Sequence, residues 1–309
     1  MYRSGEKRNA KRKYETNQYF SFISYFLFVL LFILQSQDGL NTVSLTVKTE
    51  PGTIIWVDSL RYGAVAEGGE LIVNNLSLGS HTIRARLKGK REITQGIKLS
   101  GESNQTIHLD LSKPADKAEL NFQEAEELRG VGKHAEAIDL YRRAIELRGG
   151  NYPVARIGLA RSLLSNENYN EAVAEARKAL REKGGVYPEA HTVIGNIKRT
   201  QGLYDDALAS YHMALQQAHN ISPEAHTGTA LVYQDRNSTE DAIKHFQMAI
   251  AQANETEPII YYWLGSTLER EYRNREAVEA YEKYLKLQPN TTQASALRSV
   301  LKQLRREIR

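Results

Sequence analysis

Hydrophobic positions follow two different periods along the chain. Between residues 42 and 111 apolar and polar residues alternate, as at Val43, Leu45 and Val47, which is the period of strands with one buried face. Turn sequences that contain glycine, such as Pro51-Gly52, interrupt the alternation at short intervals. We therefore predict a small antiparallel β-sandwich of about six or seven strands over residues 42–111.

Beyond a linker at residues 112–117, apolar residues recur at helical spacing and the sequence repeats itself. Five alanines stand 35 residues apart, and a small residue lies 12 positions before each of them. A period in the mid-thirties with two helices per unit predicts an all-α superhelical solenoid. The alanines are Ala137, Ala172, Ala207, Ala242 and Ala277, and the earlier small residues are Ala125, Ala160, Gly195, Ala230 and Gly265.

The repeated residues resemble those of the tetratricopeptide repeat (TPR) family. An aromatic residue follows the alanine by four positions in four of the units, at Tyr141, Tyr211, Phe246 and Tyr281. Small residues let two antiparallel helices cross closely, and the aromatic ring fills the space between neighbouring units. The resemblance covers residues 118–292 as five units of 35.

The end of the chain, residues 293–309, predicts one further helix that caps the last repeat. Ala294, Leu297, Leu301 and Leu304 stand at helical spacing and form an apolar stripe. Solenoids need such a terminal element, because the last repeat otherwise exposes its apolar side.

The resemblance also implies a binding surface. In TPR proteins the first helices of successive repeats line a concave groove that holds a peptide or a helical segment. Among these positions we predict a polar patch that binds an acidic partner or the backbone of a partner segment. The patch consists of Arg161, Asn196 and Arg199. The groove positions are Phe122, Glu126, Arg129, Arg161, Asn196, Arg199, Gln234, Tyr262 and Trp263.

Residues 19–36 read as a membrane-entry signal that follows a basic N-terminus, residues 1–18. The 16 residues from Tyr19 to Leu34 carry no charge, and a helix of that length spans about 24 Å, less than the hydrocarbon core. An uncleaved transmembrane anchor, a cleaved signal and a buried core helix stay open. Because lysine and arginine remain on the cytoplasmic side, we expect the rest of the chain to lie outside the cytoplasm, either anchored in the inner membrane or exported.

The net charge of +4 does not point to a nucleic-acid partner. Six basic and two acidic side chains within residues 1–18 account for all of it, so the remaining chain is neutral. A neutral body lacks the field that attracts phosphate. The chain has no cysteine, which excludes disulfides, thiolate metal sites and a lipid-modified cysteine.

The β region contains three short sequences that carry a family resemblance: LTVKTEPGT at 45–53, Val57-Asp58, and LGSHTI at 78–83. Through them the region is similar to the bacterial PEGA domain. This similarity implies an extracytoplasmic β module and therefore a protein of the bacterial cell envelope. Trp56 lies in an apolar stretch and is predicted to be a core residue, with a sugar-stacking platform as the alternative.

The sequence carries no recognisable catalytic chemistry. Nucleotide-binding glycine loops, nucleophile elbows and His-Glu-x-x-His are absent. His191 and His226 occupy the same position in neighbouring repeats, but packing between helices explains them more simply than a metal site does. We predict that the protein is not an enzyme and has no cofactor or metal.

These features together predict a non-catalytic scaffold that binds a protein partner in the groove, outside the cytoplasmic membrane. The alternative is a cell-wall or glycan-binding module in which the β domain recognises the ligand and the repeats act as a spacer. Exposure of Trp56 on a strand face would favour that alternative.

Overall fold

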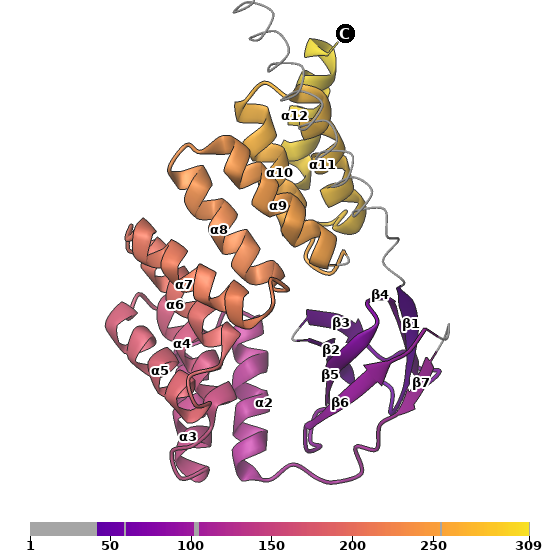
Figure 1. Cartoon of the computed structure of the whole chain (residues 1–309), viewed down its shortest axis with the longest axis vertical. Helices are drawn as coiled ribbons and strands as arrows, with labels where there is room; N and C mark the ends of the chain where they lie inside the picture. The colour runs from indigo at the N-terminus through magenta and orange to yellow at the C-terminus, as the bar shows by residue number, and fades with distance from the viewer. Residues whose placement is uncertain (1–41, 59, 102–104, 254, 309) are drawn as a thin grey trace, which may run out of the picture.

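The computed structural model describes residues 42–58, 60–101, 105–253 and 255–308, which form a β domain followed by a helical array (Figure 1). The predicted N-terminal segments, 1–18 and 19–36, lie outside the described residues. Within the described part of the chain, no helix has the length and apolar character needed to cross a membrane.

The β domain consists of two sheets packed around one apolar core. The smaller sheet has the order β4-β1-β7 and the larger the order β3-β2-β5-β6. Leu45, Val47, Ile55 and Ile83 are buried between them, as their alternation predicts. The strands are β1 Val43–Lys48, β2 Ile54–Val57, β3 Leu60–Ala64, β4 Glu70–Leu76, β5 Gly79–Arg86, β6 Ile93–Leu99 and β7 Gln105–His108.

One strand pair is parallel, so the prediction of a purely antiparallel sandwich is wrong there. β7 runs parallel to β1, whereas the other paired strands are antiparallel. β7 follows β6 of the larger sheet but joins the smaller one, so it does not form a hairpin with the strand before it. A strand that returns to a sheet after a crossover takes its direction from that crossover rather than from a local turn.

Trp56 is not a core residue, which corrects the prediction. The alternation that buries Ile55 and Val57 turns Trp56 to the outer face of the larger sheet. There the guanidinium carbons of Arg84 and Arg86 lie 4.4 and 5.1 Å from the ring centroid. The ring is half-buried under two cations.

Eleven helices follow in the described part of the chain, as five antiparallel pairs and a last single helix. α2 begins at Lys117 because the Asp116 carboxylate caps it, accepting a hydrogen bond from the Glu119 amide at 2.9 Å. The helices are α2 Lys117–Gly130, α3 His134–Leu147, α4 Pro153–Ser165, α5 Tyr169–Glu182, α6 Pro188–Thr200, α7 Tyr204–Gln217, α8 Pro223–Asp235, α9 Thr239–Ala253, α10 Ile259–Arg270, α11 Asn274–Leu287 and α12 Ala294–Glu307.

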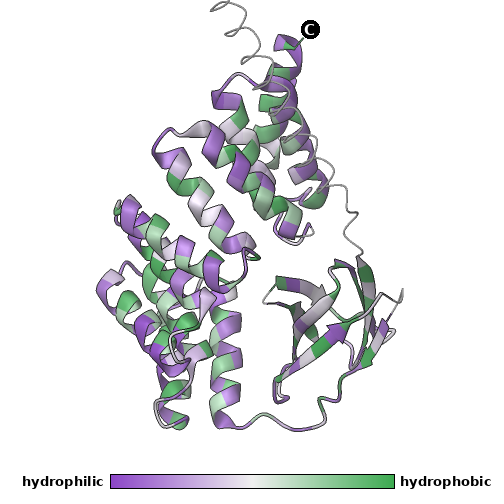
Figure 2. Cartoon of the chain, viewed as in Figure 1, coloured by the Kyte–Doolittle hydropathy of each residue, from purple (hydrophilic) through white to green (hydrophobic). Residues whose placement is uncertain are grey.

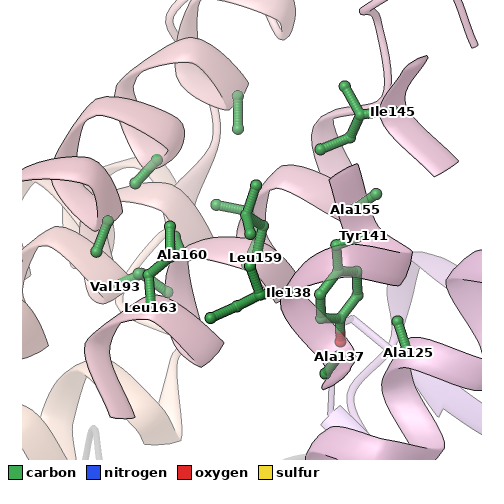
Figure 3. Close-up of a cluster of buried hydrophobic side chains, with 14 of the residues drawn as sticks. Ala125, Ala137, Ile138, Tyr141, Ile145, Ala155, Leu159, Ala160, Leu163 and Val193 are labelled. Atoms are coloured by element: carbon green, nitrogen blue, oxygen red, sulfur yellow. The ribbon is translucent and has the colours of Figure 1, made fainter. Parts of the chain in front are cut away.

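The predicted small and aromatic positions form the core of the array. All ten small residues are buried, and the four aromatic residues of the repeats are at most 3% exposed. Figure 3 shows part of this core, where Tyr141 and Leu159 lie among the small side chains of Ala125, Ala137 and Ala160. α12 buries Leu297, Leu301 and Leu304 and contacts α11, as expected of a capping helix. In Figure 2 apolar and polar residues share most helices, which fits elements buried on one side only.

Two glycines on neighbouring first helices hold the Tyr211 ring between them. A Cβ atom on Gly195 of α6 would lie 2.5 Å from the ring, and one on Gly228 of α8 would lie 2.3 Å from it. The predicted small positions include Gly195 but not Gly228. Both distances are far below van der Waals contact, so either side chain would force the fully buried ring to move.

We expect Gly228→Ala to lower the free energy of unfolding by about 1–3 kcal/mol, because the added methyl group overpacks the site against Tyr211. Urea or thermal denaturation followed by circular dichroism measures the change. Gly130→Ala is the matched control, since nothing lies within 4 Å of a Cβ at that position. Equal midpoints for the two variants would contradict the tight packing.

The turn inside every repeat contains one residue with positive φ, again at intervals of 35. The five φ angles lie between 57 and 79°. Glycine adopts this conformation without cost, whereas other residues are disfavoured in it. The residues are Gly132, Glu167, Gly202, Asn237 and Tyr272.

Tyr272→Gly should therefore stabilise the protein, because the side chain is 88% exposed and contributes little packing. The expected gain in the free energy of unfolding over Tyr272→Ala is about 0.5–1 kcal/mol. The alanine variant removes the same ring but keeps the unfavourable φ, so identical melting temperatures for the two variants would exclude backbone strain at this turn.

Candidate partner-binding groove

The first helices of the repeats lie on the inner side of the curved array. α2, α4, α6 and α8 contact one another in succession, in addition to their partners within each repeat. α10 continues the series as the first helix of the fifth repeat. The surface that these five helices line is called the concave groove below.

At the first repeat, two of the predicted groove residues, Glu126 and Arg129, form a half-buried ionic cluster. Glu126 accepts a hydrogen bond from the Tyr141 hydroxyl at 2.5 Å and pairs with Arg129 at 3.2 Å and with Arg86 of β5 at 3.4 Å. Burial alone would raise the pKa of Glu126, but the two guanidinium groups and the hydroxyl outweigh it and lower that pKa to about 2. The carboxylate is therefore charged and fully engaged.

In the middle of the groove, the predicted polar patch is paired within the chain. Arg161 of α4 and Asn196 of α6 both bind the Glu224 carboxylate at the start of α8, at 2.7 and 3.2 Å. Arg199 pairs with Asp235 at 3.2 Å. This pairing removes the uncompensated positive charge on which the expectation of an acidic partner depended.

At the last two repeats, the predicted residues take part in packing between helices. The amide of Gln234 donates to the Thr267 hydroxyl at 3.0 Å. The Tyr262 ring packs between two buried tyrosines, with centroids 5.9 and 5.6 Å away, and Trp263 stacks on Phe246 at 6.4 Å. Eight of the nine groove positions are thus partly exposed and already bonded or packed within the chain, whereas Phe122 is buried.

The β domain contacts the first helix of the groove, which the sequence did not predict. Figure 1 shows it beside α2, with α3 on the other side of that helix. Gln123 of α2 accepts from the Gly89 amide at 2.9 Å and donates to the Lys90 carbonyl at 2.8 Å, and Lys88 pairs with Glu127 at 2.9 Å. Alternating basic residues along 84–90 opposite an acidic helix are a sequence signal that could have indicated this contact.

Three matches to family models bear on this architecture. All three are described as tetratricopeptide repeat, over residues 128–197, 192–258 and 259–291. Together they run without a gap over more than half of the chain. The chain belongs to the tetratricopeptide repeat family. Members of this family are generally non-catalytic and bind protein or peptide partners, so its TPR array indicates a protein–protein interaction scaffold.

Two solved structures, those of TTC0263 and PilF, share the fold of this array. The thermophilic TPR protein TTC0263 of Thermus thermophilus is 20% identical, with a TM-score of 0.52 over 60% of this chain and 98% of that structure. PilF of Pseudomonas aeruginosa is 17% identical, with a TM-score of 0.50 over 61% and 84%. YrrB, described as a TPR protein with an unusual peptide-binding site, is 21% identical, with a TM-score of 0.39 over 59% and 92%. Comparison with curated proteins gives no match.

The two histidines at equivalent repeat positions bind different partners. The Nε2 atom of His191 lies 3.3 Å from the Gln217 amide nitrogen, while His226 lies beside His245 of α9, with their Nδ1 atoms 3.1 Å apart. The Nε2 atom of His226 faces the Asn220 carbonyl at 3.3 Å and so carries the proton, which leaves its Nδ1 to accept from His245. Within the described residues, no three His, Cys, Asp or Glu side chains gather as a metal site would require.

This histidine pair should make the TPR array less stable in mild acid. Burial and the neighbouring His226 lower the pKa of His245 to about 4, and burial also lowers the pKa of His226. Below the ordinary histidine pKa of about 6.5, the two histidines become protonated in the unfolded chain but stay neutral in the folded chain. The free energy of unfolding therefore falls as the pH falls from 7 to 5.

Asparagine at position 245 keeps a donor near the same place but does not titrate. We therefore expect His245→Asn to lose less stability between pH 7 and pH 5 than the unmodified chain, by about 1 kcal/mol after allowance for partial exposure. Melting temperatures across this pH range measure the difference. Parallel curves for the two proteins would show that the pair does not sense pH.

Proposed function

We propose that this TPR protein is a non-catalytic scaffold of the bacterial cell envelope that holds a protein segment in its concave groove outside the cytoplasmic membrane. The observation that carries the proposal is the lining itself. Charged, amide and aromatic side chains on the first helices are partly exposed at eight of the nine predicted positions, all but Phe122, and a few such anchors suffice to hold a partner segment.

The proposed location depends on two features of the N-terminal region. Residues 1–18 are basic and precede the uncharged segment at 19–36, which would leave the β domain and the repeats on the far side of the membrane. The similarity of the β region to PEGA domains agrees with that side. The segment would act as a single-pass inner-membrane anchor or, if cleaved, as an export signal.

The alternative of a cell-wall or glycan-binding module receives less support. Trp56 does lie on a strand face, but the guanidinium groups of Arg84 and Arg86 lie over its ring. Stacking on a sugar needs an open ring face. In this arrangement the two arginines occupy ring surface on which a sugar would stack.

The groove proposal is tested with Arg161→Ala, Asn196→Ala and Arg199→Ala combined in the full chain with a C-terminal tag. After mild cross-linking in a bacterial host, we expect at least a 10-fold change in the amount of co-purified partner, because these side chains and the carboxylates that they pair with line the groove. The matched control removes the same residue types from the exposed side of α5, with Asn170→Ala, Arg177→Ala and Arg181→Ala. If both triple variants co-purify the same partners in the same amounts, the groove is not the binding surface.

The same cells test the location. Protease added to spheroplasts should digest the tagged C-terminal region and leave a cytoplasmic control protein intact. A tag that survives until the membrane is dissolved would place the repeats in the cytoplasm and overturn the proposed topology.

A further inference from the structure

The outer face of the larger sheet presents three arginines around one tryptophan. In the strand register, Trp56 of β2 stands opposite Arg61 of β3 on one side and opposite Arg84 of β5 on the other, and Arg86 stands opposite Ile54. These side chains share one face because residues two apart on a strand point the same way. This set, Trp56, Arg61, Arg84 and Arg86, is called the arginine face below.

The arginine face lies against the start of the concave groove. The Arg86 guanidinium carbon lies 4.5 Å from the ring centroid of Phe122, and its nitrogens pair with Glu126 and, at 2.7 Å, with Glu92. The following hairpin adds the contacts of Lys88, Gly89 and Lys90 with Glu127 and Gln123 of α2. Phe122, one of the predicted partner-binding residues, is only 1% exposed as a result of its packing.

The same face reaches further along the groove. Burial raises the pKa of Tyr187 at the start of α6, and the guanidinium groups of Arg161 and Arg84 oppose that rise. Burial and Glu224 raise the pKa of Glu257, just before α10, and Arg61 opposes that rise. Cations of the β domain therefore lie within electrostatic reach of the third and fifth repeats as well as the first.

We propose that the arginine face is a built-in ligand of the concave groove, and that an external partner enters by displacing it with a basic, arginine-bearing segment. This inference builds on the proposed function and specifies the chemistry of its partner. Charge complementarity supports it, since Glu126 would lose Arg86 and Glu127 would lose Lys88 if the β domain moved away. A groove with those carboxylates uncovered favours a basic occupant.

Part of the contact between the β domain and α2 is exposed, so a competing segment can replace it. The Lys88–Glu127 pair is 79% and 52% exposed, and exposed ion pairs hold little free energy. The linker from β7 to α2 is short, so a released β domain stays close to the groove and competes with any partner at high effective concentration. Polar contacts between domains commonly open and close.

The first test opens the contact in the full chain with Arg86→Glu and Lys88→Glu. The probe is a fluorescein-labelled peptide of residues 82–92, TIRARLKGKRE, which carries the basic residues of β5 and its hairpin. We expect the opened variant to bind this peptide at least 10-fold more tightly than the unmodified chain, by fluorescence polarisation. The control makes the same change of charge at Arg91 and Lys98, two exposed residues for which the described residues show no ion pair.

The second test closes the contact and does not depend on a destabilising change. Because the chain has no cysteine, Lys88→Cys with Glu127→Cys introduces the only two thiols, which a short bismaleimide can bridge. Bridging should be efficient and should abolish binding of the peptide. Lys98→Cys with Glu127→Cys is the control pair and should bridge poorly.

The proposal is overturned if the opened, control and unmodified chains bind the peptide equally, if none of them binds it, or if the bridged chain still binds it. These measurements use only the purified chain and the peptide. Failure here leaves the cross-linking test of the groove unaffected, so the two proposals can fail separately.

Discussion

The close crossing of helices at small residues is the constraint on which the rest of the structure depends. Where alanine or glycine occupies the crossing, two backbones approach closely enough for an aromatic ring of the neighbouring helix to fill the space beside them. Repeating that crossing every 35 residues fixes the angle between neighbouring pairs, and that angle curves the array. The concave groove, and the set of side chains that face it, follow from this curvature rather than from any single binding residue.

The charges along the groove balance one another, which changes the interpretation of its arginines. Taken one at a time, Arg129, Arg161 and Arg199 look like free cations that await an acidic ligand. In the folded chain each has a carboxylate within 3.2 Å. A charged partner must therefore break these ion pairs before it forms its own. Such contacts contribute more to the specificity of binding than to its free energy.

The sequence predicted most of the architecture because its information is periodic. The spacing of 35 located five helix pairs, and the alternation of apolar residues predicted about six or seven strands, of which the structure has seven. It failed where the decisive contact joins distant parts of the chain. Trp56 points outward because the other face of β2 is the one that packs on the core, and alternation alone does not say which face that is. The parallel pairing of β7 with β1 depends on a crossover between the two sheets. The contact of the β domain with α2 depends on side chains more than 30 residues apart in the sequence. Gly228 was missed because its partner ring belongs to the preceding repeat.

The ion pair between Arg161 and Glu224 joins the second repeat to the fourth and passes over the third. A superhelix in which each repeat contacts only its neighbours can lengthen through a small movement between every pair of adjacent repeats. An ion pair between next-nearest repeats stiffens the concave side of the array, because the array cannot lengthen there unless Arg161 and Glu224 separate. Since the strength of such a partly exposed pair declines as salt is added, the width of the groove becomes a mechanical property that responds to the ionic strength around the protein.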